Sequence, residues 1–197
     1  MGIIASSLET NFLILVNYAG VPYDGVRRMK IMFYRVHQFI QAIFPKIASS
    51  EITWALANLP PEACSLFLKQ STTEQRHAVD VSLSLMKEQH RLTLLDFQHL
   101  LTAALLHDCG KSMVGNPLWH RVFIVLMQKM PQSTWSRLER GHTRFATPLR
   151  TASLHAIWGG NLAEKAGLDP LICRLIYEHH NPKTELGRIL ESADNKH

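Results

Sequence analysis

Apolar side chains recur at three- and four-residue steps along most of this chain, the spacing that places them on one face of an α-helix. Between positions 31 and 44 this pattern is mostly kept, and it stops at Pro45. No segment shows the sustained alternation of apolar and polar residues, rich in β-branched side chains, that is typical of strands. The pattern therefore predicts an all-α fold without a sheet.

Capping and helix-breaking residues divide the pattern into separate helices. Ser71-Thr72-Thr73-Glu74 has capping-box spacing, which predicts a helix from there to about Gln89. Elsewhere, proline in a first turn, Asp or Thr at an N-cap and Gly or Pro after a last turn mark helix ends. The further helices expected from these signals begin near Pro61 or span about 96–110, 118–130, 148–166, 170–180 and 184–194. The 118–130 helix is apolar enough that we expect it to be buried.

Composition is ordinary for a soluble domain, with 197 residues, 46% of them hydrophobic and 19% charged. This length suffices for one domain with a sizeable core. In the apolar opening segment, no Lys or Arg precedes Arg27, and the longest clean stretch, 12–16, is far shorter than a membrane span of ~20 residues. Three widely spaced cysteines make no disulfide framework. We therefore expect a cytoplasmic protein with no membrane partner.

Histidine is unusually frequent, with eleven in the chain, and several fall near expected helix ends beside carboxylates. The ordered set of imidazoles and carboxylates is His77, His107, Asp108, His155, His179, His180 and Asp194. These ligand types together suit Fe, Mn, Zn, Co or Ni, and the set is larger than one ion needs. Adjacent helical positions diverge by ~100°, so His107 and Asp108 can straddle a metal pair only at a helix end. There the imidazole would bind one ion and the carboxylate would bridge both.

These motifs resemble the HD-domain metal-dependent phosphohydrolases over about residues 60–196. The matching residues are His77, then His107-Asp108-Cys109-Gly110-Lys111, then His155-Ala-Ile-Trp-Gly159, then His179-His180 and Asp194. The resemblance is strongest to the small single-domain proteins of the HDIG type. It implies a single helical bundle of about five core helices, with N-terminal and insertion helices added.

The resemblance also implies two overlapping sets of metal ligands. The first is His77, His107, Asp108 and Asp194, and the second is Asp108, His155 and His179, with His180 as an additional or alternative ligand. Two divalent transition-metal ions (Fe, Mn, Zn, Co or Ni) would activate a hydroxide as the nucleophile. Asp108 and Lys111 are then the expected catalytic residues, with Lys111 as a phosphate contact; a solvated lysine at a helix end is the alternative.

Domain boundaries follow from this reading. We expect 1–28 to be a leader of uncertain order, 29–70 to form N-terminal helices that pack on the core, and 71–197 to form the HD metal-binding domain with a basic insertion at 112–150. The remaining histidines show no partner pattern and are predicted to be structural: His37, His90, His99, His120, His142 and His197.

Positive charge is concentrated in the insertion, where six basic residues face one acid, Glu139, giving +5, the net charge of the whole chain. Because the insertion joins Lys111 to the helix that carries His155, both its ends should lie near the metals. We expect Arg144 and Arg150, with Lys111, to contact a substrate phosphate. The alternative is a solvated basic loop without a substrate role. No nucleic-acid motif accompanies the charge, so nucleic acid is not an expected partner.

The predicted function is hydrolysis of a phosphate monoester or diester, on a small phosphate-bearing molecule that resembles a nucleotide. No Gly-Tyr-Pro stretch follows His180, so the sequence does not support cyclic di-GMP hydrolysis. Two alternatives stay open: an HD-type di-iron oxygenase, and a non-catalytic module that senses a nucleotide.

Overall fold

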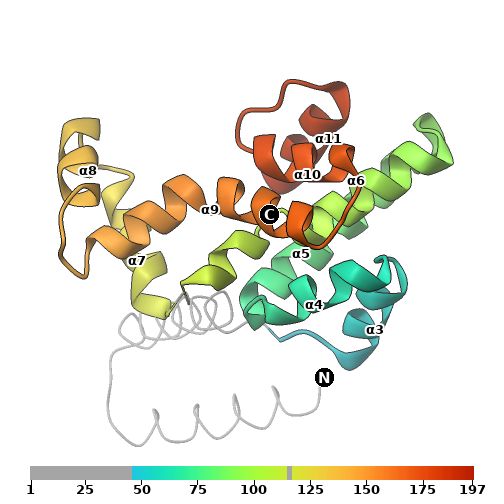
Figure 1. The fold of residues 1–197 in the computed structure, drawn as a ribbon, viewed down its shortest axis with the longest axis horizontal. Helices are drawn as coiled ribbons and strands as arrows, with labels where there is room; N and C mark the ends of the chain where they lie inside the picture. The colour runs from blue at the N-terminus through green and yellow to red at the C-terminus, as the bar shows by residue number, and fades with distance from the viewer. Residues whose placement is uncertain (1–45, 115–116) are drawn as a thin grey trace, which may run out of the picture. The chain divides into compact units, whose positions relative to one another are not determined.

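Short turns join α-helices throughout residues 46–114 and 117–197, the part of the chain that the computed structural model describes (Figure 1). The α-helices are α3 (Ser49–Ala57), α4 (Pro61–Lys69), α5 (Thr72–Leu85), α6 (Leu94–Leu106), α7 (Leu118–Met127), α8 (Gln132–Glu139), α9 (Ala146–Lys165), α10 (Pro170–Glu178) and α11 (Glu185–Asp194). Two 3₁₀-helices, η1 (Met86–Arg91) and η2 (Cys109–Met113), follow α5 and α6. No strand occurs among these residues, which confirms the all-α prediction.

Helix starts and stops largely follow the capping signals. At the start of α5, Ser71 Oγ accepts from the Glu74 N–H (3.4 Å), and the Glu74 carboxylate accepts from the Ser71 N–H (3.2 Å). Thr184 caps α11 by accepting from the Gly187 N–H at 3.0 Å. Gly167, with φ of +79°, ends α9 in the left-handed region that favours glycine.

Several expected boundaries were wrong. The α-helix that starts at Ser71 ends at Leu85 and continues only as η1, and α6 ends at Leu106, before Gly110. Helices α3 and α8 lie in the regions of the expected N-terminal and insertion helices, but their bounds were not predicted. The expected helix over 31–44 and the leader 1–28 lie outside the described residues.

The expectation that the 118–130 helix is buried is also wrong. Helix α7 covers most of that range, but Trp119 is 42% exposed, Val125 57% and Leu126 62%. An apolar sequence shows that a helix can be buried, but whether a neighbour covers each face depends on the tertiary arrangement.

The hydrophobic core is built mainly from buried side chains of α5, α6 and α10. Helix α9 packs on η2 and α10, α6 packs on α5 and α10, and α11 packs on α5 and α6. Side chains of α3 and α4, such as Ala55 and Phe67, belong to the same core. Helices α7 and α8 pack on α9 at the left of Figure 1. All these helices belong to one compact unit, residues 45–197. The predicted boundaries at 28/29 and 70/71 stay predictions.

Among the described residues, no helix has the length and apolar character needed to cross a bilayer. All three cysteines are free thiols, in agreement with the expectation that they form no disulfide framework.

Candidate metal centre

The His107–Asp108 pair sits at the end of a rigid, buried helix. Residues 100–106 of α6 are all at most 4% exposed, and so are His107 and Asp108. The backbone changes at Asp108 (φ −97°, ψ 3°) from the α-helix into η2. This change lets the two side chains face the same site, with His107 Nε2 3.7 Å from Asp108 Oδ2.

Two glycines allow the turn that carries Asp108 to approach α9. A Cβ atom on Gly110 would lie 2.0 Å from the carbonyl oxygen of His155 and 2.6 Å from the Gly159 nitrogen. A Cβ atom on Gly159 would in turn lie 3.1 Å from the Ile176 side chain. Since backbone atoms cannot yield cheaply, the close packing of η2 on α9 requires glycine at position 110. Gly110 is therefore a contact residue here, rather than the helix stop predicted for it.

One cluster of potential ligands joins three separate helices. His77 lies on α5, His107 follows α6, and Asp194 is the last residue of α11. His77 Nε2 lies 2.7 Å from Asp194 Oδ1, and His107 Nε2 lies 3.3 Å from His77 Nε2. One ligand atom from each of the three lies within 4.8 Å of the others, a spacing that could hold a metal ion.

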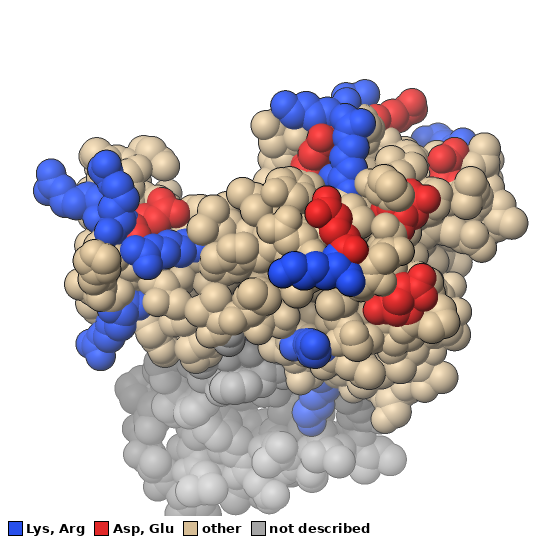
Figure 2. Space-filling model, in the orientation of Figure 1, with Lys and Arg blue, Asp and Glu red and all other residues tan. Residues whose placement is uncertain are grey.

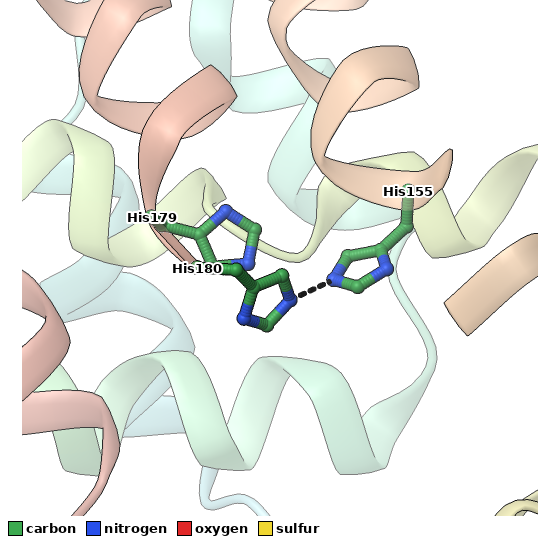
Figure 3. Close-up of side chains that lie close together, drawn as sticks. All are labelled: His155, His179 and His180. Carbon is green, nitrogen blue, oxygen red and sulfur yellow. Dashed lines mark hydrogen bonds between the residues drawn. The ribbon is translucent and has the colours of Figure 1, made fainter. Parts of the chain in front are cut away.

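A second cluster consists of His155 on α9 and of His179 and His180, which directly follow α10 (Figure 3). His155 Nε2 lies 2.9 Å from His180 Nε2, and the rings of His179 and His180 lie 3.9 Å apart. This cluster also has its ligand atoms within 4.8 Å of one another.

Asp108 lies between the two clusters. Its Oδ1 is 3.3 Å from His155 Nε2, in the second cluster, and its Oδ2 faces His107 in the first. Lys111 Nζ donates to Asp108 Oδ2 at 2.5 Å. The His107 ring also lies 5.2 Å from the His179 ring, so the clusters are adjacent. Asp108 therefore lies close to possible metal ligands of both clusters.

Backbone carbonyls orient three of the buried histidines. The Nδ1 atoms of His107, His155 and His179 lie 2.8, 2.9 and 2.7 Å from the carbonyls of Ala104, Thr151 and Ile176. A carbonyl can only accept, so each Nδ1 donates a proton and Nε2 is the ring atom left to bind a metal, as in most metal-binding histidines. The buried Nε2 of His179 has no hydrogen-bond partner among the described residues. An unsatisfied buried acceptor beside other ligands fits a cation, so the donor set passes this test for a metal site.

The carboxylates of the site stay ionised despite burial. Burial alone would raise the pKa of Asp108, but Lys111, followed by His107 and His155, outweighs it and holds the pKa well below its ordinary value. Burial is likewise outweighed at Asp194, where hydrogen bonds from His107 and His77 lower the pKa. Both groups are therefore in the form that binds metal at neutral pH.

The surroundings of His179 and His107 shift the pKa values of these two histidines in opposite directions. Burial, with repulsion from His107 and His180, lowers the pKa of His179 to about 3. At His107, burial is outweighed by Asp108 and Asp194, which raise the pKa. His179 is thus a neutral ligand, whereas His107 holds a proton more tightly than usual, and a metal ion would displace that proton.

Comparison with known families agrees with this geometry. The family model for the HD domain matches residues 75–197, which include every residue of both clusters. The chain belongs to the HD-domain family. No curated protein and no solved structure gives a significant match to it. HD domains form a superfamily of metal-dependent hydrolases that bind divalent metals, and the His/Asp clusters are residues that could hold such ions.

The predicted phosphate contacts do not all lie near the clusters. Arg150 donates to the carbonyls of Glu139 (2.9 Å) and Gly141 (2.7 Å), and the Arg144 guanidinium lies 5.2 Å from the Phe145 ring. Neither residue lines the cavity beside the histidines, whereas Lys111 does. Figure 2 shows basic side chains gathered around α8, at the far left of the view. The structure therefore brings together Lys111 and the seven expected ligands, but not the two arginines.

His120 and Arg121 were missed as site residues. Both line the cavity next to Lys111 and His155, and His120 is only 7% exposed. The one available sequence signal was their spacing, because positions 120, 121, 124 and 125 share a face of α7. That face could not be distinguished from an ordinary core face without the structure.

Cys109 does not act as a nucleophile in this site. Burial, followed by the charge of Asp108, raises the pKa of its thiol to about 12. A thiol that stays protonated is inert, and Cys109 packs beside Gly159 as a small buried side chain, its Sγ 3.8 Å from the Gly159 carbonyl oxygen.

Proposed function

We propose that this HD protein is a phosphohydrolase that uses two divalent transition-metal ions to hydrolyse a phosphate monoester or diester with a nucleotide-like organic group. The first ion would be held by His77, His107, Asp108 and Asp194. The second would be held by Asp108, His155 and His179, with His180 as a further ligand. The observation that carries the proposal is the position of Asp108 between two imidazole-rich clusters, with one oxygen toward each.

When bound, two such ions supply an activated water nucleophile and neutralise charge that develops on phosphoryl oxygens. The protein's own groups prepare the site for this chemistry. The helix carbonyls orient three Nε2 atoms toward the centre, and the two carboxylates need no proton loss at neutral pH. These features limit the reorganisation that metal binding requires.

Lys111 is the residue we assign to the phosphate. Its ammonium contacts Asp108 and also lines the adjoining cavity, so one cation lies where the metal site meets the space for an organic ligand. It is partly exposed, at 27% of its side chain, and can turn from the carboxylate to an entering phosphate. A lysine in this place favours an anionic ester over a neutral substrate.

The proposal is tested by assaying the full chain against panels of phosphomonoesters and phosphodiesters after loading with Mn, Fe, Co, Ni or Zn. We expect metal-dependent phosphate release, and Asp108→Ala should abolish turnover. Asp80→Ala is the matched control, because Asp80 lies on α5 in an ion pair with Arg76 rather than in either cluster.

Two outcomes would overturn the proposal. Iron-dependent oxygen consumption without phosphate release under any metal would show a di-iron oxygenase. Tight binding of a nucleotide that stays chemically intact on prolonged incubation with Mn or Fe would show a sensing module.

A further inference from the structure

A cavity of about 320 Å³ opens between α7 and α9 directly beside the metal clusters. One end is formed by Lys111, His155 and His180, which also belong to the candidate site. Helix α7 and the residue after it contribute positions 120, 121, 124, 125 and 128, and α9 contributes positions 148, 151, 152 and 155. Each set follows the spacing of a single helix face, so the cavity is the space between two facing helix surfaces.

One polar residue in the α7 wall of this cavity, His120, is almost completely buried. His120 is 7% exposed, and its Nδ1 atom is buried without a hydrogen-bond partner in the described parts of the chain. A buried polar nitrogen left unsatisfied costs free energy, and the same residue is part of the cavity wall. The Trp119 ring packs edge-on against the imidazole, with ring centroids 4.1 Å apart.

The remaining wall is largely apolar. Ile124 and Val125 from α7 face Pro148 and Ala152 from α9 across the cavity. Arg121, which donates to Glu74 and Ser71 at 3.1 Å, fixes α7 to the start of α5, the helix that carries His77. The volume lies at the small end of the range of about 300–1,000 Å³ typical of ligand pockets. Such a space suits one compact group.

We infer that this cavity is the substrate pocket, and that it takes a small phosphate monoester with one compact, largely apolar organic group that hydrogen-bonds to His120. This inference rests on the proposed function. The phosphate lies toward Lys111 and the metal clusters, and the organic group, such as an aryl ring or a single nucleobase, lies between α7 and α9. Val125 and His120 are the specificity-determining residues.

The test measures binding rather than turnover, by calorimetry on the full-length, Mn²⁺-loaded chain. The probes are inorganic phosphate, phenylphosphonate, whose C–P bond resists hydrolysis, and phenylphosphonates with a ring hydroxyl at each position. We expect phenylphosphonate to bind at least tenfold more tightly than phosphate. Val125→Trp, which fills the cavity, should remove this difference and leave phosphate binding within twofold.

Val122→Trp is the matched control, because Val122 is an exposed valine on the same helix that does not line the cavity. It should bind all probes as the wild type does. For His120, we expect at least one hydroxyphenylphosphonate to bind fivefold or more tightly than phenylphosphonate. His120→Phe should abolish that advantage without changing the affinity for inorganic phosphate.

The outcomes separate this inference from the proposed function. If the chain hydrolyses phosphate esters but Val125→Trp and His120→Phe leave phosphonate binding within twofold, the substrate pocket lies elsewhere and the hydrolase proposal stands. If phosphonates bind in the expected pattern but no ester is hydrolysed, the cavity is a ligand pocket, and its role as a substrate pocket falls with the hydrolase proposal. Failure of the wild type to bind any phosphonate, or equal competition by a cyclic dinucleotide, overturns the pocket.

Discussion

At the scale of single residues, the site depends on where each imidazole proton lies. His107, His155 and His179 donate from Nδ1 to carbonyls of their own helices, so the fold itself fixes the ligand atom that each presents. Asp108 then lies within reach of both clusters because Gly110 and Gly159 let its turn pack against α9. The site therefore needs both the correctly oriented side chains and the close packing of η2 on α9.

Gly110→Ala tests the role of close approach. The added Cβ would meet the His155 carbonyl and the Gly159 nitrogen, so the turn must move away from α9. We expect a loss of about 1–3 kcal/mol in the free energy of unfolding, and weaker metal binding because Asp108 is displaced from His155. Denaturant unfolding and metal titration measure the two effects. Gly141→Ala is the control for metal binding, because its Cβ would lie 3.1 Å from the Leu138 carbonyl oxygen and meet no residue of either cluster. An equal loss of metal binding in that variant would contradict the role of Gly110.

The low pKa of His179 predicts a pH dependence of stability in metal-free protein. Its pKa is about 3 in the folded chain against 6.5 for an ordinary histidine, so below pH 6.5 the unfolded state binds more protons. Stability therefore falls as the pH falls, and this group alone contributes about 2 kcal/mol of loss between pH 7.5 and pH 5. Unfolding in chelator should show a flatter pH profile for His179→Leu than for the wild type. Parallel profiles would contradict the burial of a neutral imidazole.

At the scale of elements, local signals predicted helices well and their surroundings poorly. The caps at Ser71 and Thr184 and the stop at Gly167 act within a few residues, so they could be read from the sequence. The exposure of α7 could not, because it depends on which neighbours a helix meets. For the same reason, the sequence did not identify His120 as a cavity residue, because the cavity forms only where α7 meets the opposite face of α9. The His and Asp residues of the site could be identified from the sequence, because the HD family motif consists of residues that come together in the folded domain.

The link between α7 and α5 is open to a direct test. Arg121 joins α7 to Ser71 and Glu74 at the start of α5, and its side chain is 25% exposed beside the 7%-exposed Glu74 side chain. We expect Arg121→Met to destabilise the chain by about 1–2 kcal/mol and to speed hydrogen exchange in α7 more than in α10. Arg174→Met is the control, because the Arg174–Glu178 pair is exposed and should contribute less than about 1 kcal/mol. Equal exchange in α7 and α10 would contradict the anchoring role.

At the scale of the whole molecule, the ligands come from five regions that together span more than a hundred positions, from His77 to Asp194. Helices α5, α9 and α11 and the ends of α6 and α10 each contribute at least one residue to the two clusters. A metal ion bound there would connect helices that are otherwise held by the hydrophobic core. Ligand binding to the folded state alone stabilises that state by mass action.

Thermal unfolding should therefore respond to metal identity. We expect Mn²⁺, Fe²⁺ or Co²⁺ to raise the Tm of the metal-free chain, and Mg²⁺ or Ca²⁺ to do so far less, because imidazole-rich sites favour transition metals. Differential scanning fluorimetry after chelation measures this shift. A response to Ca²⁺ as large as that to Mn²⁺ would indicate an oxygen-ligand site elsewhere.

The account depends most on two ions sharing Asp108, and the metal-to-protein ratio tests this directly. The full chain is incubated with Co²⁺ or Mn²⁺, dialysed and analysed by elemental mass spectrometry beside Asp108→Ala. We predict a ratio near two for the wild type and a loss of metal from both sites in the variant. A wild-type ratio near zero with every transition metal, or a ratio that Asp108→Ala leaves unchanged, would contradict the account.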